Sequence, residues 1–127
     1  MRIVMTGATA GFGLFAATRL LDAGHTLSIG ARAPERLPSE IAGRLSAQLL
    51  DLDSLATVRR FADVVGSEPI DILLLNAGLQ LARPATSIDG FERTFAVNHL
   101  AHYLLLRLLV DKLQPGGRII LTGSGTH

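Results

Sequence analysis

The segment "RIVMTGATAGFGLFAATRLLDAG" (residues 2–24) gives the clearest indication of the fold of this chain. It begins with a strand-sized apolar run at 2–6, passes through a loop of small residues, and continues as a helical pattern over 12–23. Gly24 follows at the position where a left-handed residue commonly ends a helix. A strand, a glycine-rich loop and a helix in this order predict the first unit of a parallel α/β sheet.

The three glycines of the loop each have a physical purpose. We expect Gly7 to allow the sharp turn off the strand, Gly11 to let a phosphate approach the backbone, and Gly13 to allow close packing of helix on sheet. The start of the helix then offers free N–H groups and a positive dipole end to a pyrophosphate. Glycines also mark ordinary turns, but this context favours a dinucleotide site. A P-loop is excluded, because no Gly-Lys-Ser/Thr follows.

The rest of the chain alternates strand-sized apolar runs with helical patterns, which predicts βαβ units. The fold class is therefore α/β, a three-layer Rossmann-type doubly wound parallel sheet, in a single domain over 1–127. Asp53 or Ser54 is placed to cap one helix, and "QPGG" (114–117) to end the last. Further strands are predicted at 26–31, 44–50, 70–75 and 118–122, and further helices at 34–42, 54–65 and 91–113.

Composition excludes several classes of protein. With 127 residues, 48% of them hydrophobic and 18% charged, the chain is long and apolar enough to bury a core. A net charge of +1 gives no basic field for nucleic acid, and the absence of cysteine removes disulfides and thiolate metal sites. We expect no metal site. Since neither a signal peptide nor a membrane span is apparent, we expect no membrane partner and a cytoplasmic location.

The end of the second strand bears on which dinucleotide is bound. An NAD site usually has an acidic side chain there, which accepts hydrogen bonds from the ribose hydroxyls. The sequence "IGARAPER" has Arg32 instead, and a guanidinium favours a 2′-phosphate. We therefore predict that NADP(H) is preferred over NAD(H). The alternative, a solvated loop arginine, stays open.

The last predicted helix, 91–113, is apolar nearly all round, so more than one of its sides must be buried. The sheet accounts for one side. The other is covered either by a second copy of the chain, which would make the protein a homo-oligomer, or by segments of the same chain.

Four motifs, in order along the chain, resemble those of the classical short-chain dehydrogenase/reductase family. The spacing Thr-Gly-x-x-x-Gly-x-Gly at 6–13 is similar to the glycine motif of that family. "LDLDS" (50–54) resembles its adenine-contacting segment. "LNAG" (75–78) resembles its Asn-Asn-Ala-Gly motif, with Leu75 in place of the first Asn. "FAVNHLAHYLLLRLLVDKL" (95–113) resembles its long interface helix, in wording closest to the retinol-dehydrogenase-like branch.

The resemblance implies an oxidoreductase that transfers hydride between a nicotinamide and a small-molecule carbonyl or alcohol. Asn98 then matches the catalytic Asn, which would hold a helix kink and a proton-relay water. Ser124, in "RIILTGSGTH" (118–127), matches the catalytic Ser; alternatively, it is only the polar end of a strand. The cofactor-binding residues implied are Thr6, Gly7, Thr9, Ala10, Gly11, Phe12, Gly13, Arg32, Asp51, Leu52, Asn76, Ala77 and Gly78.

The same resemblance implies a Tyr-x-x-x-Lys pair beyond Ser124, which these 127 residues do not include. Tyr103 stands four residues before Arg107, but it precedes Ser124 inside the apolar helix and is expected to be a packing residue. We therefore expect the N-terminal part of a longer enzyme, inactive alone, with five of an expected seven strands. The alternatives are a non-catalytic nucleotide-binding module or sensor, and a degenerate product without function.

Overall fold

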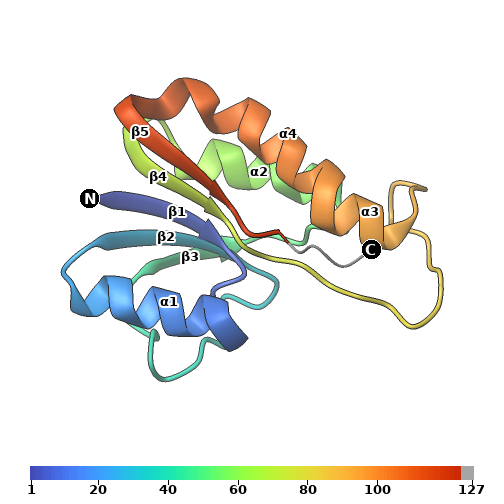
Figure 1. The fold of residues 1–127 in the computed structure, drawn as a ribbon, viewed down its shortest axis with the longest axis horizontal. Coiled ribbons are helices and arrows are strands. Elements are labelled where there is room, and N and C mark those ends of the chain that lie inside the picture. Colours follow the sequence, from blue (N-terminus) through green and yellow to red (C-terminus); the bar gives the residue numbers. More distant parts are fainter. Residues whose placement is uncertain (124–127) are drawn as a thin grey trace.

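A computed structural model of the chain describes residues 1–123. Five parallel strands form one sheet in the order β3-β2-β1-β4-β5 (Figure 1). The strands β2 and β3 are added on one side of β1, and β4 and β5 on its other side, so the switch point of the sheet lies between β1 and β4. The predicted α/β class, with a doubly wound parallel sheet, is confirmed. The strands are β1 (Arg2–Thr6), β2 (Thr26–Ala31), β3 (Ser46–Leu49), β4 (Ile70–Leu75) and β5 (Leu113–Leu121).

Helices cover both faces of the sheet. In Figure 1, α1 (Gly11–Asp22) lies below it, whereas α2 (Leu55–Val65) and α4 (Ala101–Leu109) lie above it. The side chains of β1 follow this division, because alternate residues of a strand point to opposite faces. Ile3 and Met5 pack in the core cluster between the sheet and α1, and Val4 packs in the cluster between the sheet and the helices α2 and α4.

Local signals explain the ends of the first two helices. Gly24 has a φ of 90°, and its N–H donates to the Leu21 carbonyl, as expected of a residue that ends a helix. Ser54 caps α2, since its side-chain oxygen accepts a hydrogen bond from the Thr57 N–H at 3.4 Å. The prediction of a cap at Asp53 or Ser54 is thus resolved in favour of Ser54.

The predicted helix at 34–42 is wrong. The segment forms turns, in which the Pro38 carbonyl accepts hydrogen bonds from the Ile41 and Ala42 N–H groups at 3.1 and 2.9 Å. Pro38 has no N–H to donate and would clash with a preceding helical turn, so a helix of several turns cannot run through this residue. The apolar spacing that favoured a helix has another purpose, because Ile41 is fully buried in the cluster beneath α1.

The predicted helix at 91–113 is present but not uniform. It comprises α3 (Arg93–Phe95), the π-helical turn η1 (Ala96–Leu100), α4, and the 3₁₀ turn η2 (Val110–Lys112). The sheet and α2 cover one side of α4, on which His102, Leu105 and Leu109 are buried. On the other side, Tyr103 is 54% exposed.

The last strand begins earlier than predicted. β5 starts at Leu113, so "QPGG" (114–117) lies inside the strand rather than at the end of the helix. The pairing of β5 with β4 shifts register between Ile70 and Ile72, and Gly116, with a φ of 80°, accommodates the extra residues. Downstream of this bulge β5 is exposed, with Ile120 at 43% and Leu121 at 64%.

Candidate dinucleotide-binding site

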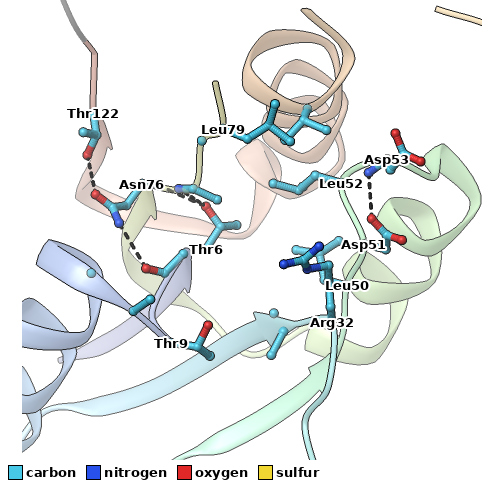
Figure 2. A pocket seen from close by; sticks show the side chains of 18 of the residues that line it. Thr6, Thr9, Arg32, Leu50, Asp51, Leu52, Asp53, Asn76, Leu79 and Thr122 are labelled. Atoms are coloured by element: carbon cyan, nitrogen blue, oxygen red, sulfur yellow. Dashed lines mark hydrogen bonds between the residues drawn. The ribbon is translucent and has the colours of Figure 1, made fainter. Parts of the chain in front are cut away.

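A cavity of about 460 Å³ lies where the carboxyl ends of the parallel strands meet the start of α1 (Figure 2). This is the switch point of the sheet, where ligands bind in open α/β folds. In Figure 2, Arg32, Leu50 and Asp51 line one side of the cavity, and Asn76 and Thr122 line another. The sheet topology therefore gathers residues from distant parts of the sequence.

The glycine loop forms the floor of the cavity and admits no side chain at two positions. A Cβ on Gly7 would lie 2.7 Å from the Ala77 backbone, and a Cβ on Gly13 would lie 1.6 Å from the Gly7 carbonyl oxygen. Gly11 is different, because its φ of 56° is left-handed but no atom lies within 4 Å of the Cβ it lacks. Gly7 and Gly13 are thus needed for packing, while Gly11 leaves open space at the start of α1.

The N-terminus of α1 keeps its backbone donors free of side-chain caps among the described residues. Ala10, the N-cap, is extended and has no side chain that could accept from the helix, and the first turn carries no acidic residue. The unpaired N–H groups and the positive end of the helix dipole are therefore available to an anion. Thr9, Ala10 and Phe12 line the cavity at this end.

Thr6, at the end of β1, joins the glycine loop to β4. Its Oγ1 accepts hydrogen bonds from the N–H groups of Asn76 and Ala77, both at 3.1 Å. The Asn76 amide then donates to the Gly7 carbonyl at 3.1 Å and accepts from the Thr122 hydroxyl at 2.8 Å (Figure 2). Three strand ends and the glycine loop are therefore held as one unit.

A second group of residues forms the side of the cavity beyond β2 and β3. The Asp51 carboxylate accepts a hydrogen bond from the Asp53 N–H at 2.9 Å, which shapes the loop before α2. Gly30 permits close packing here, since a Cβ on it would lie 2.3 Å from the Leu50 side chain. Arg32, at the end of β2, is exposed and lines the cavity.

An ion pair that the sequence did not predict ties this loop to the long helix. Nε of Arg93 lies 3.1 Å from Oδ1 of Asp53, and both residues line the cavity. Both atoms are buried, but neither makes an aligned hydrogen bond in the described part of the chain, so the contact is electrostatic. No local signal pairs two charges forty residues apart, and only the fold brings them together.

Asn98 lies in the π-helical turn η1, beside the cavity rather than in its lining. Its amide makes two hydrogen bonds to the Leu79 backbone, accepting from N–H and donating to C=O, each at 2.8 Å. Leu79 lines the cavity and directly follows "LNAG" (75–78). Asn98 thereby fixes the path of the chain that leaves β4.

The structure brings nearly all the predicted cofactor-binding residues to this cavity. Gly11 belongs to the loop but not to the lining, and Asp51, Leu52 and Gly78 lie in the lining with the rest. The predicted catalytic Ser124 lies outside the described residues. Lining residues that sequence analysis missed include Asp53, Leu79, Arg93, Val97 and Thr122. Of these, Thr122 could have been found, because it follows β5 as Asn76 follows β4.

Two further properties bear on the kind of protein. Among residues 1–123, no three His, Asp or Glu side chains are grouped in a way that could hold a metal ion. No helix in that part of the chain is both long enough and apolar enough to span a bilayer.

The glycine loop, the switch-point cavity and the open helix N-terminus define a nucleotide-binding α/β protein. The family described as "short chain dehydrogenase" matches residues 1–127, and the chain belongs to it. The family assignment made from the motifs is thus confirmed, and these residues carry the nicotinamide-dinucleotide-binding fold of an oxidoreductase family.

Individual relatives agree with this assignment. Retinol dehydrogenase 13 of Homo sapiens is 37% identical over 137 residues, a match that covers 98% of this chain. Protochlorophyllide reductase A of Oryza sativa subsp. japonica is 36% identical over 140 residues and also covers 98% of the chain. A short-chain dehydrogenase/reductase from Burkholderia multivorans, solved with bound NADP, superimposes with a TM-score of 0.81 at 27% identity, covering 98% of this chain and 58% of that one.

The likeness to the retinol-dehydrogenase-like branch is therefore confirmed, but the chain is shorter than these relatives. It spans 41% of the length of the human protein and 36% of the rice protein.

Proposed function

We propose that residues 1–127 form the cofactor-binding part of an NADP(H)-dependent oxidoreductase that acts on a small-molecule carbonyl or alcohol. The observation that carries this proposal is the cavity at the switch point of the sheet, which is lined by the glycine loop, Arg32 and the ends of β4 and β5. The alternative of a non-catalytic module is not favoured, because the family is one of oxidoreductases.

The residues of the cavity fit a dinucleotide. The open space above Gly11 and the uncapped start of α1 suit a pyrophosphate, which needs close backbone approach and free N–H donors. The loop at Asp51 and Leu52 would hold the adenine, and the segment Asn76–Ala77–Gly78 would line the way toward the nicotinamide. The bound cofactor would supply or accept a hydride.

A preference for NADP(H) has two supports. Arg32 is exposed at the cavity, and no acidic residue ends β2, so a ribose 2′-phosphate would meet a cation there. The Burkholderia multivorans relative was solved with NADP. Titration of the protein with NADPH and with NADH, followed by nicotinamide fluorescence, tests both binding and preference. Binding of neither cofactor would overturn the proposal.

We assign the chemistry around the substrate to Ser124 and Asn98. The Ser124 hydroxyl would hydrogen-bond the substrate oxygen, and Asn98 would hold the turn of the helix and a water through which a proton passes. Oxidation of NADPH that depends on an added carbonyl tests this assignment in the protein at its full expressed length. Ser124→Ala should abolish that oxidation and leave NADPH binding unchanged.

We also propose that the protein is a homo-oligomer and acts in the cytoplasm. The outer side of the long helix supports the first point, since Phe95, Tyr103 and Val110 are 50%, 54% and 41% exposed. For the protein at its full expressed length, light scattering coupled to size exclusion should give a dimer or larger, and Tyr103→Arg should give a monomer. A fluorescent fusion tests the location.

A further inference from the structure

His102 is a buried polar side chain to which the proposed function assigns no role. It lies on α4, 5% exposed, on the side of the helix that faces the sheet. Its Nε2 lies 2.9 Å from Oγ1 of Thr6, the residue that ends β1. Thr6 is itself 1% exposed, so the contact is shielded from water.

The partners of Thr6 determine which proton is shared. A threonine hydroxyl has one proton to donate and two lone pairs to accept with. Both acceptor positions are occupied, because the N–H groups of Asn76 and Ala77 each donate to Oγ1 at 3.1 Å. The hydroxyl must therefore donate its proton to His102, and Nε2 of the ring is the acceptor.

The tautomer of His102 follows from this assignment. A neutral imidazole that accepts at Nε2 carries its proton on Nδ1. Nδ1 lies 3.4 Å from the main-chain carbonyl oxygen of Asn98, one turn earlier in the helix, so it donates in that direction. Burial of the ring lowers the pKa of His102, which keeps it in the neutral form that this pattern requires.

A continuous chain of hydrogen bonds thus runs from the π-helical turn to the floor of the cavity. It passes from Asn98 through His102 to Thr6, then to the N–H groups of Asn76 and Ala77. Ala77 in turn packs so closely on Gly7 that no Cβ would fit between them. The His102 ring therefore links the π-helical turn to the backbone that lines the cavity.

We propose that His102 is a positioning residue for the cofactor site. By accepting the Thr6 proton, it aims both lone pairs of that hydroxyl at the N–H groups of Asn76 and Ala77, and so fixes the wall against which the glycine loop is built. This inference rests on the proposed function, because the ligand positioned is the dinucleotide.

A purely apolar role for the ring predicts something different. If His102 only fills space beneath α4, leucine should replace it without loss, whereas glutamine should be worse because of its buried amide. If His102 acts as an acceptor, the order reverses, since the Gln carbonyl can receive the Thr6 proton and Leu cannot.

The experiment compares NADPH binding by the wild type, His102→Gln, His102→Leu, Thr6→Val and Thr6→Val/His102→Leu, at full expressed length. We expect His102→Leu to weaken NADPH binding by about tenfold and His102→Gln by less than about threefold. The double variant should bind NADPH no more weakly than the weaker-binding of the two single variants, because both changes remove the same Thr6–His102 hydrogen bond. His99→Leu and His99→Gln are matched controls, since His99 is exposed and stacks on Phe95.

A second measurement separates this inference from the proposed function. Hydrogen exchange at the Asn76 and Ala77 amides should be faster in His102→Leu than in the wild type, and unchanged in His102→Gln, whether or not NADPH binds. Failure of the wild type to bind NADPH, with this exchange pattern intact, would overturn the proposed function and leave only the role of His102 in ordering the Asn76 and Ala77 backbone. Slow exchange and unchanged NADPH binding in folded His102→Leu would overturn the inference.

Discussion

The hydrogen of Gly13 points at the carbonyl oxygen of Gly7, and a Cβ in its place would lie 1.6 Å from that oxygen. No rotation of a side chain can relieve such an overlap, because the backbone fixes the position of a Cβ and the oxygen is itself a backbone atom. The first turn of α1 and the loop that follows β1 therefore lie closer together than they could with any residue other than glycine at position 13.

From this contact we expect Gly13→Ala to destabilise the chain by roughly 3 kcal/mol and to abolish NADPH binding. Gly11→Ala is the matched control, since it meets open space and incurs only the left-handed backbone cost of about 1 kcal/mol. Urea unfolding of both variants gives the comparison. Equal losses would mean that backbone conformation, rather than the overlap, limits this loop.

Replacing Arg32 should change the choice of cofactor. We expect Arg32→Asp to weaken NADPH binding by about 10- to 100-fold and to leave NADH binding equal or stronger, because a charge-assisted hydrogen bond is lost and a repulsive charge is gained. Fluorescence titration measures both constants. Arg36→Asp makes the same charge change in the same exposed loop, outside the cavity lining. Were the two variants to behave alike, Arg32 would have no specific role.

The stability of the fold should depend on pH through His102. Burial lowers the pKa of this ring in the native state, below the value of about 6.5 that it takes when unfolded. Above pH 6.5 its contribution to stability is complete. As the pH falls below 6.5, the unfolded chain takes up a proton that the native ring does not, so stability declines until the native pKa is passed.

Urea unfolding at pH 7.5 and pH 5.5 tests this dependence. We expect the wild type to lose more stability between these values than His102→Gln, which cannot titrate. His99→Gln is the matched control and should behave as the wild type does, because His99 is exposed and stacks on Phe95 rather than lying in the buried network. An equal loss in the wild type and His102→Gln would show that other groups govern the dependence.

The end of β5 should make the 127-residue chain self-associate. Ile119, Ile120 and Leu121 are 39%, 43% and 64% exposed along a strand with one unpaired edge in the described structure. We expect Ile120→Lys to lower the apparent mass in light scattering at high concentration. Val64→Lys, at a 51% exposed apolar position on α2, should have no such effect. The opposite ranking would locate self-association away from β5.

The strands, the glycine loop and three of the four predicted helices could be predicted because each has a local cause. The pattern at 2–6 is apolar, Ser54 can cap only the helix that follows it, and Gly24 readily adopts the left-handed conformation that ends one. The prediction of a helix at 34–42 is wrong because Pro38 cannot continue a helical turn. The true cause of the apolar spacing in this segment, the burial of Ile41, is tertiary.

The class of this protein can be predicted from sequence alone, because the order of strands, glycines and helices admits few packings, and the motifs that identify the family lie in short stretches. Which residues share the site, in contrast, depends on tertiary packing. Thr6 and His102 are separated by 96 positions, and Asp53 and Arg93 by 40, yet each pair is in contact. Such contacts depend on how the sheet orders its strands and on which side of a helix faces it, and no local pattern of residues encodes either.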